Sequence, residues 1–494
     1  MIKRIKSFLF ENKSEKQTFL KNTFWLSGGT MASRIVRAFM IIYAARILGT
    51  EGYGIFSYAL SLAAFFTIFS DVGLSGLLTR ELVKKPEETQ RYIATTLRIK
   101  FAFVILGIAF TLFVAPWFIK VDAARPLLPV VALLLAFDSM RIFIFAITRS
   151  KNKMEIESGL SVLTDIFITI FGFTALFLLP NAQWLAIAYT AGSGLGFFTA
   201  FFVVRKWAGD FFRGFDRSLV KPVLSSAWPF AVMGLLGGFM INIDTIIIGW
   251  FRSASELGLY GAVQRPIQVF YMLLGFINTS LFPLLSKFAH EEKNERTKTV
   301  LERAIAGALA IALPLTIGGI IVGTPFIKLL FGTQYLEGTL TFQLLLLTLI
   351  PVFAGSMIGN AVFAYDRQKI FLASVGMGAA TNIILDLALI PSYGIAGSAV
   401  ATIVAQVISN GYVYVKFKRI IPVSIVPLLG KITLAALGMG IAVFGVSRAG
   451  WTVIPAIILG VIVYAALLFL LKEPLLEVIG IRKPIEKSIE AGPR

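Results

Sequence analysis

Apolar runs long enough to cross a lipid bilayer recur along almost the whole 494-residue chain, separated by short polar breaks. A helix of roughly 20 mostly apolar residues spans the hydrocarbon layer of a membrane. The pattern therefore predicts an all-α polytopic membrane protein with about fourteen transmembrane helices. The predicted spans are residues 22–46, 52–78, 93–119, 126–149, 158–179, 183–205, 222–250, 256–285, 303–331, 338–364, 369–391, 394–419, 426–446 and 451–471.

Composition excludes several other classes of protein. Hydrophobic residues make up 57% of the chain and charged residues only 15%, whereas soluble domains carry about 25% charged residues. A soluble enzyme, a disordered chain and a nucleic-acid-binding domain are therefore excluded. The chain has no Cys, so disulfides, thiolate zinc sites and thiol catalysis are excluded too. The single histidine, His290, cannot build a multi-histidine metal site. We predict no metal site and no catalytic residue.

The positive charge of the chain is distributed by side of the membrane. If the N-terminus is cytoplasmic, 33 of the 46 Lys and Arg residues fall in inner segments and 7 inside spans. The six expected on the outer side are Arg46, Lys120, Arg125, Arg252, Lys328 and Arg448. This bias follows the positive-inside rule. It predicts a multi-pass protein of the cytoplasmic membrane with both termini cytoplasmic, and it explains the net charge of +19 without nucleic acid.

Short matches between the two halves of the chain indicate an internal repeat. Gly54-Ile55-Phe56 follows the first span, and Gly258-Leu259-Tyr260 follows the seventh, 204 residues later. Spans one to six then correspond to spans seven to twelve, as two parallel copies about an axis along the membrane normal. The predicted organisation is a basic cytoplasmic tail (1–21), an N-terminal six-helix lobe (22–205), a cytoplasmic linker (206–221), a C-terminal six-helix lobe (222–419), an extra helix pair (420–471) and a cytoplasmic tail (472–494).

Several stretches of the chain resemble signatures of one transporter family, in family order. They are 45–56 (ARILGTEGYGIF), 71–75 (DVGLS), 259–262 (LYGA), 282–286 (FPLLS) and 390–402 (IPSYGIAGSAVAT). In these stretches the chain is similar to the polysaccharide-export flippases of the multidrug/oligosaccharidyl-lipid/polysaccharide exporter superfamily. The resemblance covers essentially the whole chain.

The resemblance implies two six-helix lobes around a central cavity that opens alternately to the two sides. It implies a flippase and not an enzyme, with an isoprenoid-linked glycan as cargo, typically an undecaprenyl-pyrophosphate-linked oligosaccharide. The implied partners are the bilayer and the polymerase or export proteins of a polysaccharide pathway. No cofactor is implied, and the residues do not distinguish coupling to protons, to sodium or to the membrane potential.

Two arginines lie near the middle of the first span, and we predict that they bind the cargo. Arg34 and Arg37 are three residues apart, which places them on one face of a helix. Guanidinium groups match phosphate oxygens in two-point contacts and keep their charge, so the pair is expected to clamp a pyrophosphate. The alternative is a structural ion pair with a carboxylate on a neighbouring span.

The other charges inside the spans are interpreted in the same way. Arg141 and Asp138 can pair within one helix; alternatively Arg141 binds the cargo and Asp138 serves coupling or gating. Asp244 and Arg265 are expected to pair between helices; alternatively Arg265 binds the cargo, or the two residues form a gate that breaks on opening. Asp165 and Asp386 can carry a coupling ion or make packing hydrogen bonds. Three cations near span ends are expected to reach the interface along their flexible side chains: Arg98, Lys100 and Lys431.

Three rival functions follow from the same sequence. A peptidoglycan-precursor flippase carries a similar pyrophosphate head, so the arginines do not separate it from the first hypothesis. A multidrug or cation antiporter needs carboxylates for its cargo, and the first span offers two arginines instead. A membrane glycosyltransferase or polymerase needs acid and base residues in a sizeable loop, which the short outer loops do not provide.

Overall fold

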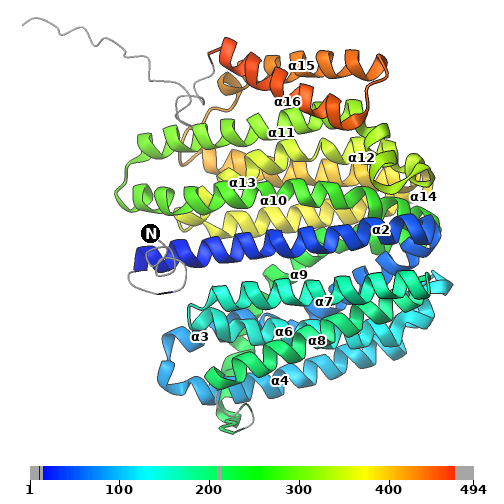
Figure 1. The fold of residues 1–494 in the computed structure, drawn as a ribbon. Helices are drawn as coiled ribbons and strands as arrows, with labels where there is room; N and C mark the ends of the chain where they lie inside the picture. Colours follow the sequence, from blue (N-terminus) through cyan, green and yellow to red (C-terminus); the bar gives the residue numbers. More distant parts are fainter. Residues whose placement is uncertain (1–10, 12–14, 209–210, 212, 473–494) are drawn as a thin grey trace, which may run out of the picture. The chain divides into compact units, whose positions relative to one another are not determined.

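The computed structural model describes residues 11, 15–208, 211 and 213–472 (Figure 1). Most of the two predicted tails, 1–21 and 472–494, lies outside the described residues. Within them every regular element is a helix or a helical turn. Its helices are α2 (Glu15–Asp71), α3 (Leu74–Lys84), α4 (Thr89–Ala109), α5 (Ala115–Phe118), α6 (Leu128–Ser150), α7 (Met154–Leu178), α8 (Ala182–Ala208), α9 (Val220–Phe251), α10 (Ala254–His290), α11 (Asn294–Phe331), α12 (Thr339–Leu346), α13 (Leu349–Ala364), α14 (Gln368–Lys418), α15 (Val426–Arg448) and α16 (Val453–Leu470).

Short turns of tighter or wider helix precede or extend several of these elements. They are the 3₁₀ turns η1 (Pro86–Glu88), η3 (Asp122–Leu127), η4 (Arg217–Leu219) and η5 (Thr333–Gly338) and the π turn η2 (Phe110–Val114). In hydrocarbon no water is available to hydrogen-bond a free N–H or C=O group. Each apolar run therefore folds as a helix, which satisfies those groups within the segment.

The prediction of about fourteen membrane spans is confirmed. Among the described residues, eleven helical stretches are long and apolar enough to cross a bilayer. Two of them, in α2 and α14, are 48 and 51 residues long, which is more than twice the roughly 20 residues that one crossing needs. Each therefore supplies two crossings, and the 37-residue α10 supplies the eighth predicted span.

A glycine divides each of these two long helices into two crossings. Gly49 in α2 has φ 70° and ψ −178°, and Gly394 in α14 has φ 58° and ψ −143°. Both conformations lie in the left-handed half of the map, where a Cβ would clash with the backbone. The two glycines thus mark the ends of the first and eleventh spans, close to the predicted limits at 46 and 391.

The second span is shorter than predicted, because the helix breaks before residue 78. α2 ends at Asp71, and Val72 and Gly73 both adopt positive φ, 45° and 73°, before α3 begins. The Asp71 carboxylate accepts a hydrogen bond from Ser75 Oγ at 2.5 Å. A side chain at Gly73 would meet the backbone of α9, so the break lets α3 pack closely against that helix.

Two loops that the predicted repeat makes equivalent have the same backbone geometry, which the loop after α10 also adopts, with φ 53° at Glu292. The loop after α6 turns at Asn152 and the loop after α13 turns at Asp366, each with φ 54°. In both, three consecutive amides bond back four, three and five residues: Lys151, Asn152 and Lys153 in one, and Tyr365, Asp366 and Arg367 in the other. The lobe boundaries remain a prediction, because close packing groups the helices differently.

By close packing the chain falls into two units. The first comprises residues 1–268, 330–341 and 372–405, and the second comprises 269–329, 342–371 and 406–494. In the first unit α7 packs against α2 and α8, and α8 also packs against α6 (Figure 1). In the second, α15 and α16 pair, and Val322 of α11 packs in one apolar cluster with Met439, Val443 and Ala456.

The linker between α8 and α9 is anchored by one carboxylate outside the spans. Asp216 accepts hydrogen bonds from Ser218 Oγ at 2.6 Å and Ser218 N at 2.8 Å, and from the Arg91 guanidinium. These donors favour the charged form and lower the pKa of Asp216 to about 2. The contact fastens the linker to the N-terminal part of α4.

Replacing Gly73 should destabilise the fold. Gly73→Ala is expected to lower the free energy of unfolding by about 2–4 kcal/mol, because the residue has positive φ and its new Cβ would overlap the α9 backbone. Thermal unfolding of the purified variant in detergent measures this. Gly411→Ala is the matched control, since no atom lies within 4 Å of its Cβ position. Equal unfolding temperatures for the two variants would contradict the role given to Gly73.

Candidate functional site

Arg37 is held between two helices that sequence reasoning did not connect to it. Its Nε donates to Asp165 Oδ1 on α7 at 2.8 Å, and its Nη2 contacts the same oxygen. Its Nη1 donates to the Tyr189 hydroxyl on α8 at 2.9 Å. Asp165 is 2% exposed and the Arg37 side chain 34%. Arg37 therefore neutralises a buried carboxylate and still presents part of its guanidinium group.

Arg34 differs from Arg37, although it lies one turn away on α2. It is exposed, and no hydrogen bond or ion pair of Arg34 is found among the described residues. The charges of Arg37 and Arg265 are close enough to repel it, and the charge of Asp165 is close enough to attract it. An intramembrane cation without a partner is expensive. Arg34 therefore has guanidinium donors that an external anion could accept from.

Arg141 and Asp138 form the pair within α6 that their spacing allows, and α8 adds a third member. Arg141 Nη2 lies 2.8 Å from Asp138 Oδ1 and Nη1 lies 3.0 Å from Ser193 Oγ. Ser193 Oγ in turn donates to Asp138 at 2.7 Å. Asp138 also acts electrostatically on Arg37, so this pair is part of the same charged region.

The expected pair between Arg265 and Asp244 is not formed. Arg265 Nη1 instead lies 3.4 Å from Gln268 Oε1, one turn further along α10. The Arg265 Nε atom is buried without a hydrogen-bond acceptor. Arg265 thus keeps unused donor capacity. We call Arg34, Arg37, Arg141 and Arg265, together with Asp138 and Asp165, the arginine cluster.

Asp244 belongs to a second polar group, in which Asp386 is the other carboxylate. Tyr260 Oη donates to Asp244 Oδ2 at 2.5 Å, and Thr402 Oγ1 donates to the same oxygen at 3.1 Å. Asn382 Nδ2 bridges the two carboxyl groups, at 3.0 Å from Asp244 and 2.8 Å from Asp386. Asp244 is 2% and Asp386 0% exposed. We call Asp244 and Asp386 the buried carboxyl pair.

The buried carboxyl pair cannot carry two negative charges. No cation contacts either group among the described residues, and Asp386 Oδ1 is buried without a hydrogen-bond partner. Two adjacent carboxylates in a site of low dielectric constant repel each other strongly, so they share at least one proton or bind a cation. As packed here, the α9–α10–α14 contact therefore contains a site that holds at least one positive charge.

Lys100 corrects another expectation. We expected its side chain to reach the interface, but it is 0% exposed and pairs with Asp71. The two residues lie on neighbouring helices, and hydropathy does not reveal which positions of two helices face each other. Tyr189, Ser193, Tyr260 and Thr402 were missed for the same reason: a hydroxyl in an apolar span gives no signal until its charged neighbour is known.

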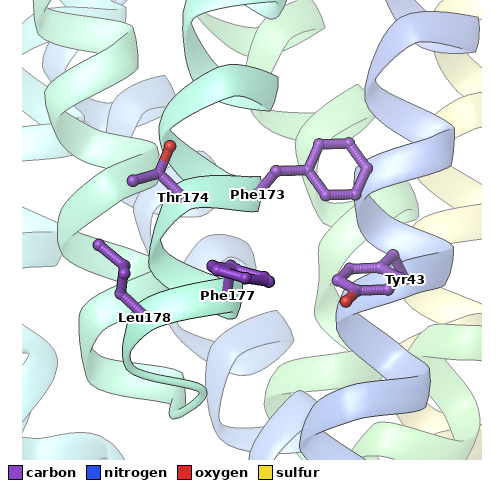
Figure 2. Close-up of a pocket in the computed structure, with 5 residues that line it drawn as sticks. All are labelled: Tyr43, Phe173, Thr174, Phe177 and Leu178. Carbon is purple, nitrogen blue, oxygen red and sulfur yellow. The ribbon is translucent and has the colours of Figure 1, made fainter.

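An apolar pocket of about 390 Å³ lies beside the contact between α2 and α7. In Figure 2 one lining residue, Tyr43, comes from α2 and the other four come from α7: Phe173, Thr174, Phe177 and Leu178. Tyr43 follows Arg37 by six residues, which turns it about 120° away around the helix. Phe177 is 82% exposed. The pocket is therefore separate from the arginine cluster and suited to face lipid.

The two arginines of α2 should differ in their effect on stability. Arg37→Ala leaves Asp165 buried without a partner and is expected to lower the free energy of unfolding by about 1–3 kcal/mol, a buried-pair value reduced because Arg37 is partly exposed. Arg34→Ala breaks no pair and should change it little. Adding Asp165→Ala to Arg37→Ala should recover much of the loss. Thermal unfolding in detergent measures all three; a larger loss for Arg34→Ala would contradict the assignment.

Comparisons with known proteins agree with this architecture. The chain is 20% identical to a lipid II flippase MurJ of known structure in an inward closed conformation, with a TM-score of 0.75 over 92% of this chain and 99% of that one. A multidrug resistance MATE family transporter gives a TM-score of 0.60 at 14% identity, over 86% of this chain and 98% of that one. The fold of these transporters is therefore the fold of this chain.

Sequence relatives point to the same class of protein. The "Probable flippase AglR" of Haloferax volcanii is 25% identical over 78% of this chain and 80% of its own length. The capsular polysaccharide biosynthesis protein CapF of Staphylococcus aureus is 18% identical over 81% of this chain and all of its own. The prediction of a flippase-type transporter and not an enzyme is confirmed. Residues 19–289 match the family described as "Polysaccharide biosynthesis protein", and the chain belongs to that family.

Proposed function

We propose that this protein flips an isoprenoid-pyrophosphate-linked oligosaccharide across the cytoplasmic membrane for cell-surface polysaccharide biosynthesis. One observation carries the proposal, and it is the charge of the arginine cluster. Four guanidinium groups face two carboxylates, which leaves an excess of two positive charges within the spans. A pyrophosphate that links a lipid to a sugar carries two negative charges. The cargo head would thus bring the cluster to neutrality.

The members of the arginine cluster would have different roles. Arg34 and Arg265 have free donors and would bind the phosphate oxygens directly. Arg37 and Arg141 would add positive field and further donors, while Asp165 and Asp138 hold them in position. The isoprenoid chain would stay in lipid, and the sugar would follow the pyrophosphate. No bond is made or broken, so binding geometry and charge are sufficient.

Transport would follow alternating access between two lobes, with both termini on the cytoplasmic side. The distribution of Lys and Arg residues between loops supports this orientation, and the recurrence of the Gly54 motif at Gly258 supports two related lobes (22–205 and 222–419). The cargo head would enter from the inner side and leave on the outer side. Delivery to polymerase or export proteins of the same pathway would follow.

The two rival transport functions fit the observations less well. The charge match serves a peptidoglycan precursor equally, but the sequence relatives include capsular polysaccharide and low-salt glycan biosynthesis proteins. An organic cation would meet the excess positive charge of the arginine cluster and be repelled. Rescue of a strain depleted of its peptidoglycan-precursor flippase, or drug resistance on overexpression, would favour the respective rival.

We propose that the buried carboxyl pair couples transport to a cation gradient. Its oxygen atoms and those of Asn382 and Thr402 suit a proton, and they also suit sodium, which prefers oxygen ligands. Uptake of one positive charge would remove the repulsion between Asp244 and Asp386. This would change how tightly α9, α10 and α14 pack, and the gradient would thereby favour one state of the cycle.

Removal of the arginines that lack an ion-pair partner should slow transport strongly without unfolding the protein. Arg34→Ala and Arg265→Ala should each reduce flipping by about 10–100-fold, the value of a lost hydrogen bond to a charged group. The assay uses proteoliposomes with undecaprenyl-pyrophosphate-linked N-acetylglucosamine, whose arrival in the opposite leaflet is detected with a sugar-modifying enzyme. Lys151→Ala, in an exposed inner loop, is the control. Normal flipping by the Arg34→Ala, Arg265→Ala double variant would refute the binding role.

The coupling role of the buried carboxyl pair has its own test. Asp386→Asn keeps the shape of the side chain but removes its charge, so flipping should no longer respond to an imposed proton or sodium gradient. The same liposome assay measures this with and without each gradient. Asp122→Asn, at a residue whose side chain is 83% exposed, should keep the wild-type response. A gradient response retained by Asp386→Asn would contradict the coupling role.

A further inference from the structure

The glycine motif occurs once in each half of the chain, and its two copies pack against each other. Gly54 of α2 and Gly258 of α10 are 204 residues apart, as are Thr50 and Ala254. A Cβ added at Gly54 would overlap the Ala254 carbonyl oxygen and lie 2.8 Å from Gly258 N. A Cβ added at Gly258 would overlap the Thr50 carbonyl oxygen and lie 3.0 Å from Gly54 N. We call these four residues the glycine crossing.

The glycine crossing is reciprocal, as in a symmetric dimer of parallel helices. In each segment a small residue precedes the glycine by four positions, the spacing that lets membrane helices approach backbone to backbone. One turn further along, Ser57 lies against Gly261, and these two are again 204 residues apart. Equivalent positions therefore face each other across the crossing, which places it on the axis that would relate the two halves.

The contact is tight, but nothing locks it. The backbone groups concerned belong to helices, and among the described residues one side-chain hydrogen bond joins the two segments, from Ser255 Oγ to Thr50 Oγ1 at 2.7 Å. Apart from this hydrogen bond, the small residues leave no interlocked side chains to separate when the helices move apart. The crossing can thus be closed by close packing and opened without leaving an unpaired buried charge.

A second contact fastens the same end of the first span. The Tyr335 hydroxyl of η5, which is fully buried, lies 2.8 Å from the Ala45 carbonyl oxygen and 3.0 Å from that of Gly49. Gln334 Nε2 donates to the Arg46 carbonyl oxygen at 3.1 Å. These carbonyls flank the kink at Gly49, and η5 comes from the second half of the chain. Two segments of the second half, the start of α10 and η5, therefore both contact this end of the first span.

We propose that the glycine crossing is the outer gate of the transporter. This inference rests on the proposed function and on the orientation that places residues 46–51 on the outer side. With the crossing closed, the outer ends of the two repeat halves are joined and the cargo head cannot leave. Release requires Thr50–Gly54 to separate from Ala254–Gly258 and the Tyr335 contacts to break.

A disulfide across the glycine crossing tests the gate. The chain has no Cys, so Thr50→Cys with Ser255→Cys introduces the only two thiols, at positions whose hydroxyls are 2.7 Å apart. Oxidation should abolish flipping of undecaprenyl-pyrophosphate-linked N-acetylglucosamine in proteoliposomes, and reduction should restore it. Full activity of the completely oxidised protein would overturn the proposal.

The matched control joins two helices of one half. In Met40→Cys with Gly172→Cys, the new side chain at 172 starts 3.0 Å from the Cγ position of residue 40, so α2 and α7 are cross-linked within the first half. This bond should leave flipping unchanged. Loss of activity in both oxidised proteins would show that any cross-link stops the cycle, and it would overturn the assignment of the gate to the crossing.

A measurement without cargo separates failure of the gate from failure of the proposed function. In Thr50→Cys alone, an impermeant maleimide added outside should react about tenfold more slowly than with Asp122→Cys, since labelling waits for a minor open state. Adding Gly258→Leu should remove that protection. If these rates hold but no variant flips the lipid, the proposed cargo is wrong and the gate stands. Equal rates at residues 50 and 122 would overturn the gate.

Discussion

The cost of placing a charge in hydrocarbon determines where this chain can carry ionisable groups. Each such group must find a partner, reach water, or lose its charge. Arg37 and Asp165 satisfy the rule by pairing, as do Arg141 and Asp138 and also Lys100 and Asp71. The buried carboxyl pair satisfies it by sharing positive charge. Arg34 and Arg265 have no carboxylate partner among the described residues, so they can satisfy the rule by contact with water or with a bound anion.

The arginine cluster and the buried carboxyl pair both lie in the first unit, and α10 connects them. Arg265 is on α10 five residues after Tyr260, and Tyr260 donates to Asp244. A change in packing around the carboxyl pair would therefore act on the helix that carries Arg265. This gives a short physical path, a little over one helical turn long, between the proposed coupling ion and the proposed cargo site.

The helical architecture was predictable from sequence because the membrane imposes a strong local rule. Each run of about 20 apolar residues must become a helix, and fourteen spans followed from that alone. The break at Val72 and Gly73 was not predicted, because a glycine within an apolar run does not by itself indicate a positive φ. Contacts between helices were harder to predict than the helices, since hydropathy determines neither the rotation nor the depth of one helix against another. The predicted Arg265–Asp244 pair was therefore wrong. For Arg37 the sequence predicted a possible carboxylate partner on a neighbouring span but did not identify it as Asp165.

The glycine crossing has a consequence for how the sequence can change. At most tight contacts in a protein, a larger side chain on one surface can be accommodated by a smaller one opposite. Here the obstacle on each side is the partner's main chain, the carbonyl oxygen of Ala254 or of Thr50. No second substitution can shorten a carbonyl group. Residues 54 and 258 are therefore each confined to glycine by the other half of the same chain, and neither half can drift at this point without separating from its counterpart.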